Sequence, residues 1–172
     1  MSIERSLPIP GWMNEPELYW LEAQARTHSC IVEVGCWMGR STRTLVDNTP
    51  GIVYAVDTWR GSEEHRGDFV GKDPDWVYDA FKANMADRDN VHVMRMTSLE
   101  AAEKWSGATF DMVFIDAAHD YDSIRADILA WKPLVHGLLC GHDHGHPPIT
   151  RAVAELLPGA GSTVGIWHVE LP

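Results

Sequence analysis

The chain has 172 residues, 45% of them apolar and 23% charged, which is typical of a globular protein with a sizeable core. Its 14 lysines and arginines against 25 acidic residues give a net charge of −11, which argues against nucleic-acid binding because phosphate contacts require a basic face. No apolar run approaches the ~20 residues of a membrane span, and no apolar leader is visible. The three cysteines have no pair spacing, so we expect reduced thiols in a cytoplasmic protein.

Apolar strands alternate with amphipathic helices along the chain. We expect residues 1–172 to form a single domain in which 1–29 is an N-terminal helical segment. The helices are predicted at 16–27 with a cap at Asn14, 41–46, 75–85, 98–105 with a cap at Ser98, 121–131 and 147–157. The strands are predicted at 31–35, 52–56, 91–94, 110–115, 137–141 and 163–169. Continuous apolar strands between helices indicate a doubly wound, mainly parallel α/β sheet, and 60–73 is a long loop of the kind that often forms a lid.

A glycine-bearing turn follows the first predicted strand, in the sequence E-V-G-C-W-M-G at 33–39. Glycine lets the backbone approach a ligand closely because it has no Cβ. The turn lacks the G-x-G-x-x-G spacing of a dinucleotide site, which favours an adenosine-type cofactor without a pyrophosphate. Glu33 inside the strand needs a partner. A cationic cofactor such as S-adenosylmethionine would supply one, and the alternative is a pair with Arg40 or Arg43.

Asp57 ends the second predicted strand, about twenty residues after the turn. A carboxylate at this position can accept hydrogen bonds from the two hydroxyls of a ribose, although it is also a position for a helix cap. Trp59 follows closely and is a candidate for covering the adenine, with ordinary packing as the alternative.

Two further clusters follow the fourth and fifth predicted strands. Asp116 and His119 lie where open α/β sheets place their ligands. Residues 142–146, H-D-H-G-H, concentrate imidazoles and a carboxylate at the end of the adjacent strand. Because both groups are good ligands for divalent metals, the two clusters predict a metal site at this edge of the sheet.

Taken together, these motifs resemble the class I S-adenosylmethionine-dependent methyltransferases, and more narrowly the metal-dependent O-methyltransferases that act on sugar hydroxyls of macrolides and related polysaccharides. The matching segments are 33–42, 56–59, 114–121 and 141–143. The resemblance implies a Rossmann-like, mainly parallel seven-stranded sheet with helices on both faces and an antiparallel last strand. It also implies a small hydroxylated acceptor as substrate, and it leaves the acceptor and the oligomeric state open.

The resemblance also implies roles for individual residues. His119 would be the general base, and Asp116, His142 and Asp143 would hold a divalent metal, usually Mg²⁺. Since the family often has an acid where His142 stands, Mn²⁺, Zn²⁺ or Fe²⁺ becomes credible, and the participation of His142 stays open. The cofactor would be held by Glu33, Gly35, Trp37, Gly39, Asp57, Trp59, Ser98 and Asp116.

Two other functions fit the same sheet. The first is a nicotinamide-dependent oxidoreductase, which the missing glycine fingerprint disfavours. The second is a non-catalytic protein that binds a nucleoside or a metal.

Overall fold

The computed structural model describes residues 3–61 and 67–172, so part of the predicted loop 60–73, residues 62–66, lies outside the described chain. Within the described residues, a seven-stranded sheet has the order β3-β2-β1-β4-β5-β7-β6. Strands β1 to β5 are parallel, whereas β7 runs antiparallel to both β5 and β6. The predicted doubly wound, Rossmann-like α/β fold with an antiparallel end is therefore confirmed.

The elements lie close to their predicted positions. The strands are β1 Cys30–Val34, β2 Ile52–Asp57, β3 Val91–Arg95, β4 Phe110–Ile115, β5 Val135–Gly141, β6 Gly161–Thr163 and β7 Ile166–Leu171. The α-helices are α1 Glu15–Ala25, α2 Arg40–Asn48, α3 Trp76–Met85, α4 Ser98–Lys104, α5 Tyr121–Trp131 and α6 Pro147–Leu156. The short 3-10 helices η1 Ile3–Arg5 and η3 Lys132–Leu134 accompany them.

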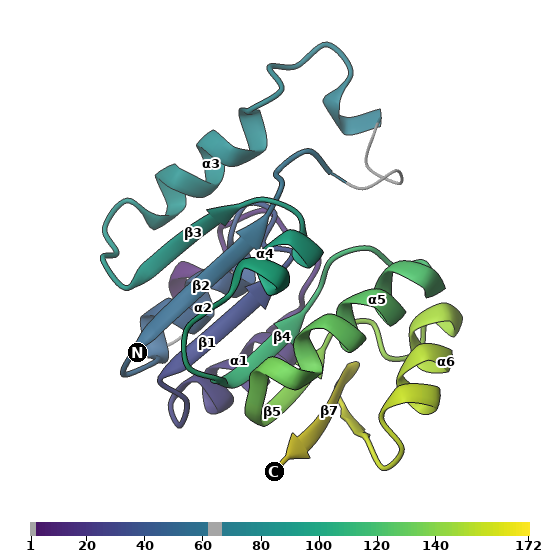
Figure 1. The fold of residues 1–172 in the computed structure, drawn as a ribbon. Helices are drawn as coiled ribbons and strands as arrows, with labels where there is room; N and C mark the ends of the chain where they lie inside the picture. Colours follow the sequence, from purple (N-terminus) through teal and green to yellow (C-terminus); the bar gives the residue numbers. More distant parts are fainter. Residues whose placement is uncertain (1–2, 62–66) are drawn as a thin grey trace.

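Helices cover both faces of the sheet (Figure 1). One core cluster packs α1, α2 and α3 against the sheet, with Leu18, Leu45 and Phe81 fully buried. The other packs α4, α5 and α6 against the opposite face, around Trp131 and Phe110. Alternate residues of the central strands enter opposite clusters, which explains why these strands are continuous apolar runs.

Two local predictions were wrong. The helix predicted to begin with a Ser98 cap is capped by Thr97, whose hydroxyl accepts from the Glu100 amide while the Glu100 carboxylate accepts from the Thr97 amide. The single last β segment is a hairpin of two strands, because Val164 and Gly165 adopt left-handed conformations that turn the chain. The predicted Asn14 cap of α1 is confirmed.

The strand order places the functional residues. The chain leaves β1 towards β2 on one side and later enters β4 on the other, so a crevice opens beyond the carboxyl ends of β1 and β4. Among the described helices, none is both long and apolar enough to cross a bilayer.

Candidate active site

The glycine turn lies between β1 and α2, at this crevice. Gly35 has φ +88°, and a Cβ there would lie 2.0 Å from the backbone oxygen of Asp116, the residue that follows the neighbouring strand β4. Gly39 has φ +92° and begins α2, where a Cβ would meet the side chain of Met85 at 2.8 Å. Both positions therefore require glycine. At Gly35, the absence of a Cβ lets the turn pack directly against the loop after β4.

Asp57 fixes the turn from the end of β2. Its Oδ2 accepts from the backbone N–H groups of Cys36 and Trp37 at 2.8 and 3.0 Å, and its Oδ1 accepts from the Trp59 N–H at 2.7 Å. Trp37 and Trp59 both have positive φ, 48° and 53°, which is unfavourable for bulky residues. The carboxylate stabilises these two conformations and keeps about one of its four acceptor sites for a ligand hydroxyl.

Glu33 lies beneath the turn and is completely buried. Its Oε2 accepts from the Thr42 hydroxyl, and its Oε1 has no hydrogen-bond partner among the described residues. Burial raises the pKa of Glu33 to about 7, an effect that hydrogen bonds from Ser41 and Thr42 oppose and the Asp116 charge reinforces. Glu33 is thus placed behind the crevice wall rather than on its surface.

The two arginines proposed as alternative partners of Glu33 bind elsewhere. Arg43 pairs with Asp47 and Asp87. Arg40 donates to the backbone oxygens of Leu7, Ile9 and Met13, at 3.3, 2.6 and 2.9 Å. The pairing alternative is therefore wrong, and Arg40 instead ties the N-terminal segment to the first turn of α2.

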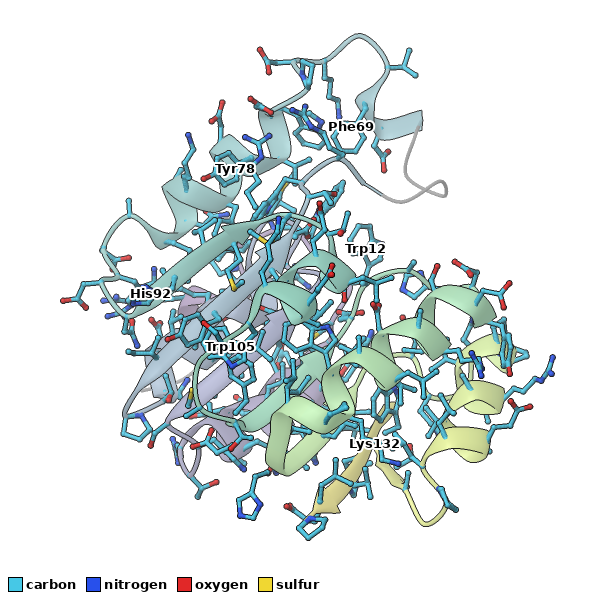
Figure 2. All side chains as sticks on the ribbon, in the orientation of Figure 1. Trp12, Phe69, Tyr78, His92, Trp105 and Lys132 are labelled. Carbon is cyan, nitrogen blue, oxygen red and sulfur yellow. The ribbon has the colours of Figure 1, made fainter. Side chains whose placement is uncertain are left out.

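The aromatic residues divide between core and crevice. Trp59 is 1% exposed, packs on Tyr78 and Phe81, and does not line the crevice, so the expectation that it covers an adenine is wrong. Trp37 does line it, with its ring centroid 5.3 Å from that of Trp12. Trp12 is 63% exposed and lies near the carboxyl end of the sheet, whereas Phe69 projects from the segment before α3 (Figure 2).

Ser98 lines the crevice from the start of α4. Its hydroxyl accepts from the indole N–H of Trp131 at 2.9 Å, which fixes it to the buried face of α5. A hydroxyl that accepts one hydrogen bond keeps its own O–H as a donor, and the Ser98 side chain also hydrogen-bonds the Asp127 carboxyl.

The loops after β4 and β5 bring Asp116, His142 and Asp143 together. One potential ligand atom from each of these residues lies within 4.8 Å of the others. His142 Nδ1 is 3.3 Å from Asp143 Oδ2 and 3.5 Å from Asp116 Oδ1, and His119 Nε2 is 3.0 Å from the same Asp143 oxygen. One imidazole nitrogen and two carboxylates converging on one point form a donor set that fits a divalent metal.

Electrostatics connect the members of this cluster. Burial alone would lower the pKa of His142, but hydrogen bonds to Asp116 and Asp143 overcome this and raise it to about 11. Hydrogen bonds from His119 and His142 lower the pKa of Asp143. Asp143 also has φ +58°, a conformation that aspartate tolerates better than most residues.

A cavity of about 500 Å³ joins the glycine turn to this cluster. Its wall includes Gly35, Trp37, Asp57 and Ser98 on one side and Asp116, His119, His142 and Asp143 on the other. His146 also lines it, and His144 does not.

Three residues at this site were not predicted from the sequence. Trp12 and Ser41 also line the cavity, and Glu17 contacts His142. The only sequence signal for Glu17 was its place three residues after the Asn14 cap.

Comparison with known families identifies the fold's functional class. Residues 32–144 match the family model described as a methyltransferase domain. The chain belongs to this family. The match spans the glycine turn, Asp57, His119 and the Asp116–Asp143 cluster, and it decides in favour of a methyltransferase over a nicotinamide-dependent oxidoreductase.

Solved structures agree on the fold. An O-methyltransferase from Bacillus cereus, in complex with S-adenosylhomocysteine, aligns with a TM-score of 0.69 and 20% identity, over 98% of this chain and 90% of that one. The O-methyltransferase TomG from Streptomyces achromogenes, in complex with S-adenosylmethionine and involved in tomaymycin synthesis, aligns with a TM-score of 0.66 and 18% identity, over 99% and 86%.

A relative by sequence is much longer than this chain. The uncharacterized protein y4gI of Sinorhizobium fredii is 28% identical over 133 residues, which cover 73% of this chain and 14% of that protein. The matched part of the chain thus spans about one seventh of the length of this relative.

Proposed function

We propose that this chain transfers the methyl group of S-adenosylmethionine to a hydroxyl of a small polar acceptor, a sugar being one candidate, with a divalent metal held by Asp116, His142 and Asp143. The observation that carries the proposal is the single cavity whose wall contains both the glycine turn and the Asp/His/Asp cluster. Methyl transfer needs the donor carbon and the acceptor oxygen in one enclosed space, in line with the leaving sulfur.

On this proposal, the turn holds the cofactor. Gly35 lines the cavity, Gly39 lets the turn pack against Met85 and Phe81, Trp37 covers the cofactor, and Asp57 offers its remaining acceptor site to a ribose hydroxyl. The buried Glu33 carboxyl lies behind the wall, with one oxygen that has no partner among the described residues, and a cationic cofactor in front of it would favour its ionised form.

The chemistry takes place at the other end of the cavity. A bound divalent cation would lower the pKa of the acceptor hydroxyl and fix its direction. His119 accepts the hydroxyl proton while the oxygen forms its bond to the methyl carbon and the carbon–sulfur bond breaks, which leaves S-adenosylhomocysteine. Asp143 holds the His119 ring through the 3.0 Å contact to Nε2.

The test is transfer of tritium from methyl-labelled S-adenosylmethionine to a panel of sugars, phenols and other hydroxylated compounds. We expect labelled product with the wild type, and a loss of 10²- to 10⁴-fold with His119→Ala, because a general base contributes about that much. Binding of S-adenosylhomocysteine should be largely unchanged in that variant. Cofactor binding without label transfer to any acceptor would favour the non-catalytic binder, and wild-type turnover by His119→Ala would exclude His119 as the base.

A further inference from the structure

We infer that Glu17 is a positioning residue for the metal site, and that it directs His142 so that the site prefers a first-row transition ion to Mg²⁺; this rests on the proposed metal-assisted function. Glu17 Oε1 lies 3.1 Å from His142 Nε2, and the two side chains are only 10% and 8% exposed. The opposite ring nitrogen, Nδ1, is the one that faces Asp116 and Asp143. The ring is therefore held between a carboxylate on one side and the proposed ligand set on the other.

Glu17 itself is fixed by the start of α1. Its second oxygen, Oε2, accepts from the Asn14 N–H at 2.6 Å, while Asn14 Oδ1 accepts from the Glu17 N–H at 3.2 Å. The turn between β6 and β7 closes over the same carboxylate, since a Cβ on Gly165 would lie 3.2 Å from Glu17 Oε1. Little freedom is left for the carboxylate to follow a rotated imidazole.

This arrangement matches the way proteins orient histidine ligands. A metal-bound imidazole usually donates its other N–H to a carboxylate, which fixes the tautomer and the ring direction, and loss of that partner typically costs 10- to 100-fold in metal affinity. Here Nε2–H would donate to Glu17, so Nδ1 would be the ligand nitrogen. Imidazole suits ions such as Fe²⁺, Ni²⁺ and Zn²⁺, and the affinity of a nitrogen-containing site for Co²⁺ lies between those for Fe²⁺ and Ni²⁺, whereas Mg²⁺ prefers an all-oxygen set.

The experiment is calorimetric titration of the cofactor-free protein with Co²⁺ and with Mg²⁺, supported by the visible absorption of bound Co²⁺. The variants are Glu17→Ala, Glu17→Gln and His142→Asp. Glu22→Gln is the matched control, because Glu22 is a buried glutamate of the same helix that pairs with Arg26 away from the site. Thermal unfolding of each variant identifies those that remain folded, and Glu17→Gln, which keeps the side-chain size and one acceptor oxygen, serves if Glu17→Ala does not fold.

We expect the wild type and Glu22→Gln to bind Co²⁺ at least about tenfold more tightly than Mg²⁺. Glu17→Ala should lose 10- to 100-fold in Co²⁺ affinity, and Glu17→Gln should lose less, because an amide oxygen still accepts from Nε2–H. His142→Asp should reduce the Co²⁺ to Mg²⁺ affinity ratio. Wild-type Co²⁺ affinity in a folded Glu17 variant, an unchanged ratio in His142→Asp, or no metal binding by the wild type would each overturn the inference.

These outcomes are independent of methyl transfer. Label transfer to an acceptor without any metal binding would refute the role of Glu17 and leave the methyltransferase activity standing. The expected metal selectivity without label transfer would support the role of Glu17 and count against the proposed activity.

Discussion

Replacing Glu33 with glutamine should make the protein less sensitive to pH. Glu33 is fully buried, and its folded-state pKa is about 7 against an ordinary value of 4.5. Because the folded state holds this proton more tightly than the unfolded state, ionisation of Glu33 reduces stability as the pH rises from about 4.5 through about 7. The difference of about 2.5 pKa units corresponds to roughly 3 kcal/mol at 1.36 kcal/mol per unit.

The assay is urea unfolding of the cofactor-free wild type and Glu33→Gln at pH 5, 6, 7 and 8. Near pH 5 the protonated glutamate resembles glutamine, so the two proteins should have similar unfolding free energies. By pH 8 the variant should be more stable by up to about 3 kcal/mol. Taking the difference between the two proteins cancels other titrating groups, such as Asp127, whose pKa burial raises to about 6. A difference that stays constant with pH, or that grows towards low pH, would contradict the raised pKa of Glu33.

Four further substitutions test the crevice and the core. Gly35→Ala should lower the unfolding free energy by more than about 1–2 kcal/mol and weaken S-adenosylhomocysteine binding. The reason is that the new Cβ would clash with the Asp116 backbone and that alanine is strained at a φ of +88°. A wild-type unfolding free energy together with wild-type binding would contradict the assigned contact. Asp57→Asn should cost about 1–3 kcal/mol in urea unfolding, because three backbone N–H groups lose a carboxylate partner, and an unaffected midpoint would count against that network. Trp12→Ala should cost less than about 1 kcal/mol and Trp131→Ala about 3–5 kcal/mol, since the first side chain is exposed and the second is fully buried; equal losses would show that the burial is misjudged.

Much of the fold was predictable because the periodicity of apolar residues is strong. The residues of β1 and β4 alternate between the two core clusters, so both faces of each strand contribute apolar residues. Each strand is therefore visible in the sequence as an apolar segment. The prediction that the last β segment is one strand failed because its turn uses Val164 in a left-handed conformation, for which valine gives no sequence signal.

The site was predictable where it depends on strand ends. Asp57 ends β2, and Asp116 and Asp143 follow β4 and β5, so the parallel sheet brings the three residues to one edge. The directions of side chains were not predictable in the same way. Trp37 and Trp59 both have positive φ, yet Trp37 lines the cavity and Trp59 is buried in the core. Glu17 reaches His142 only through the packing of α1 on the sheet, which has no local signature.

The most direct test that the crevice binds the methyl-donor nucleoside is calorimetric titration of the wild-type chain with S-adenosylhomocysteine, alone and in the presence of Mn²⁺. We predict one nucleoside bound per chain, at a site that Gly35→Ala weakens and Glu22→Gln leaves unchanged. A folded wild-type protein that gives no binding heat under either condition, and whose melting temperature the nucleoside does not shift, would contradict this prediction.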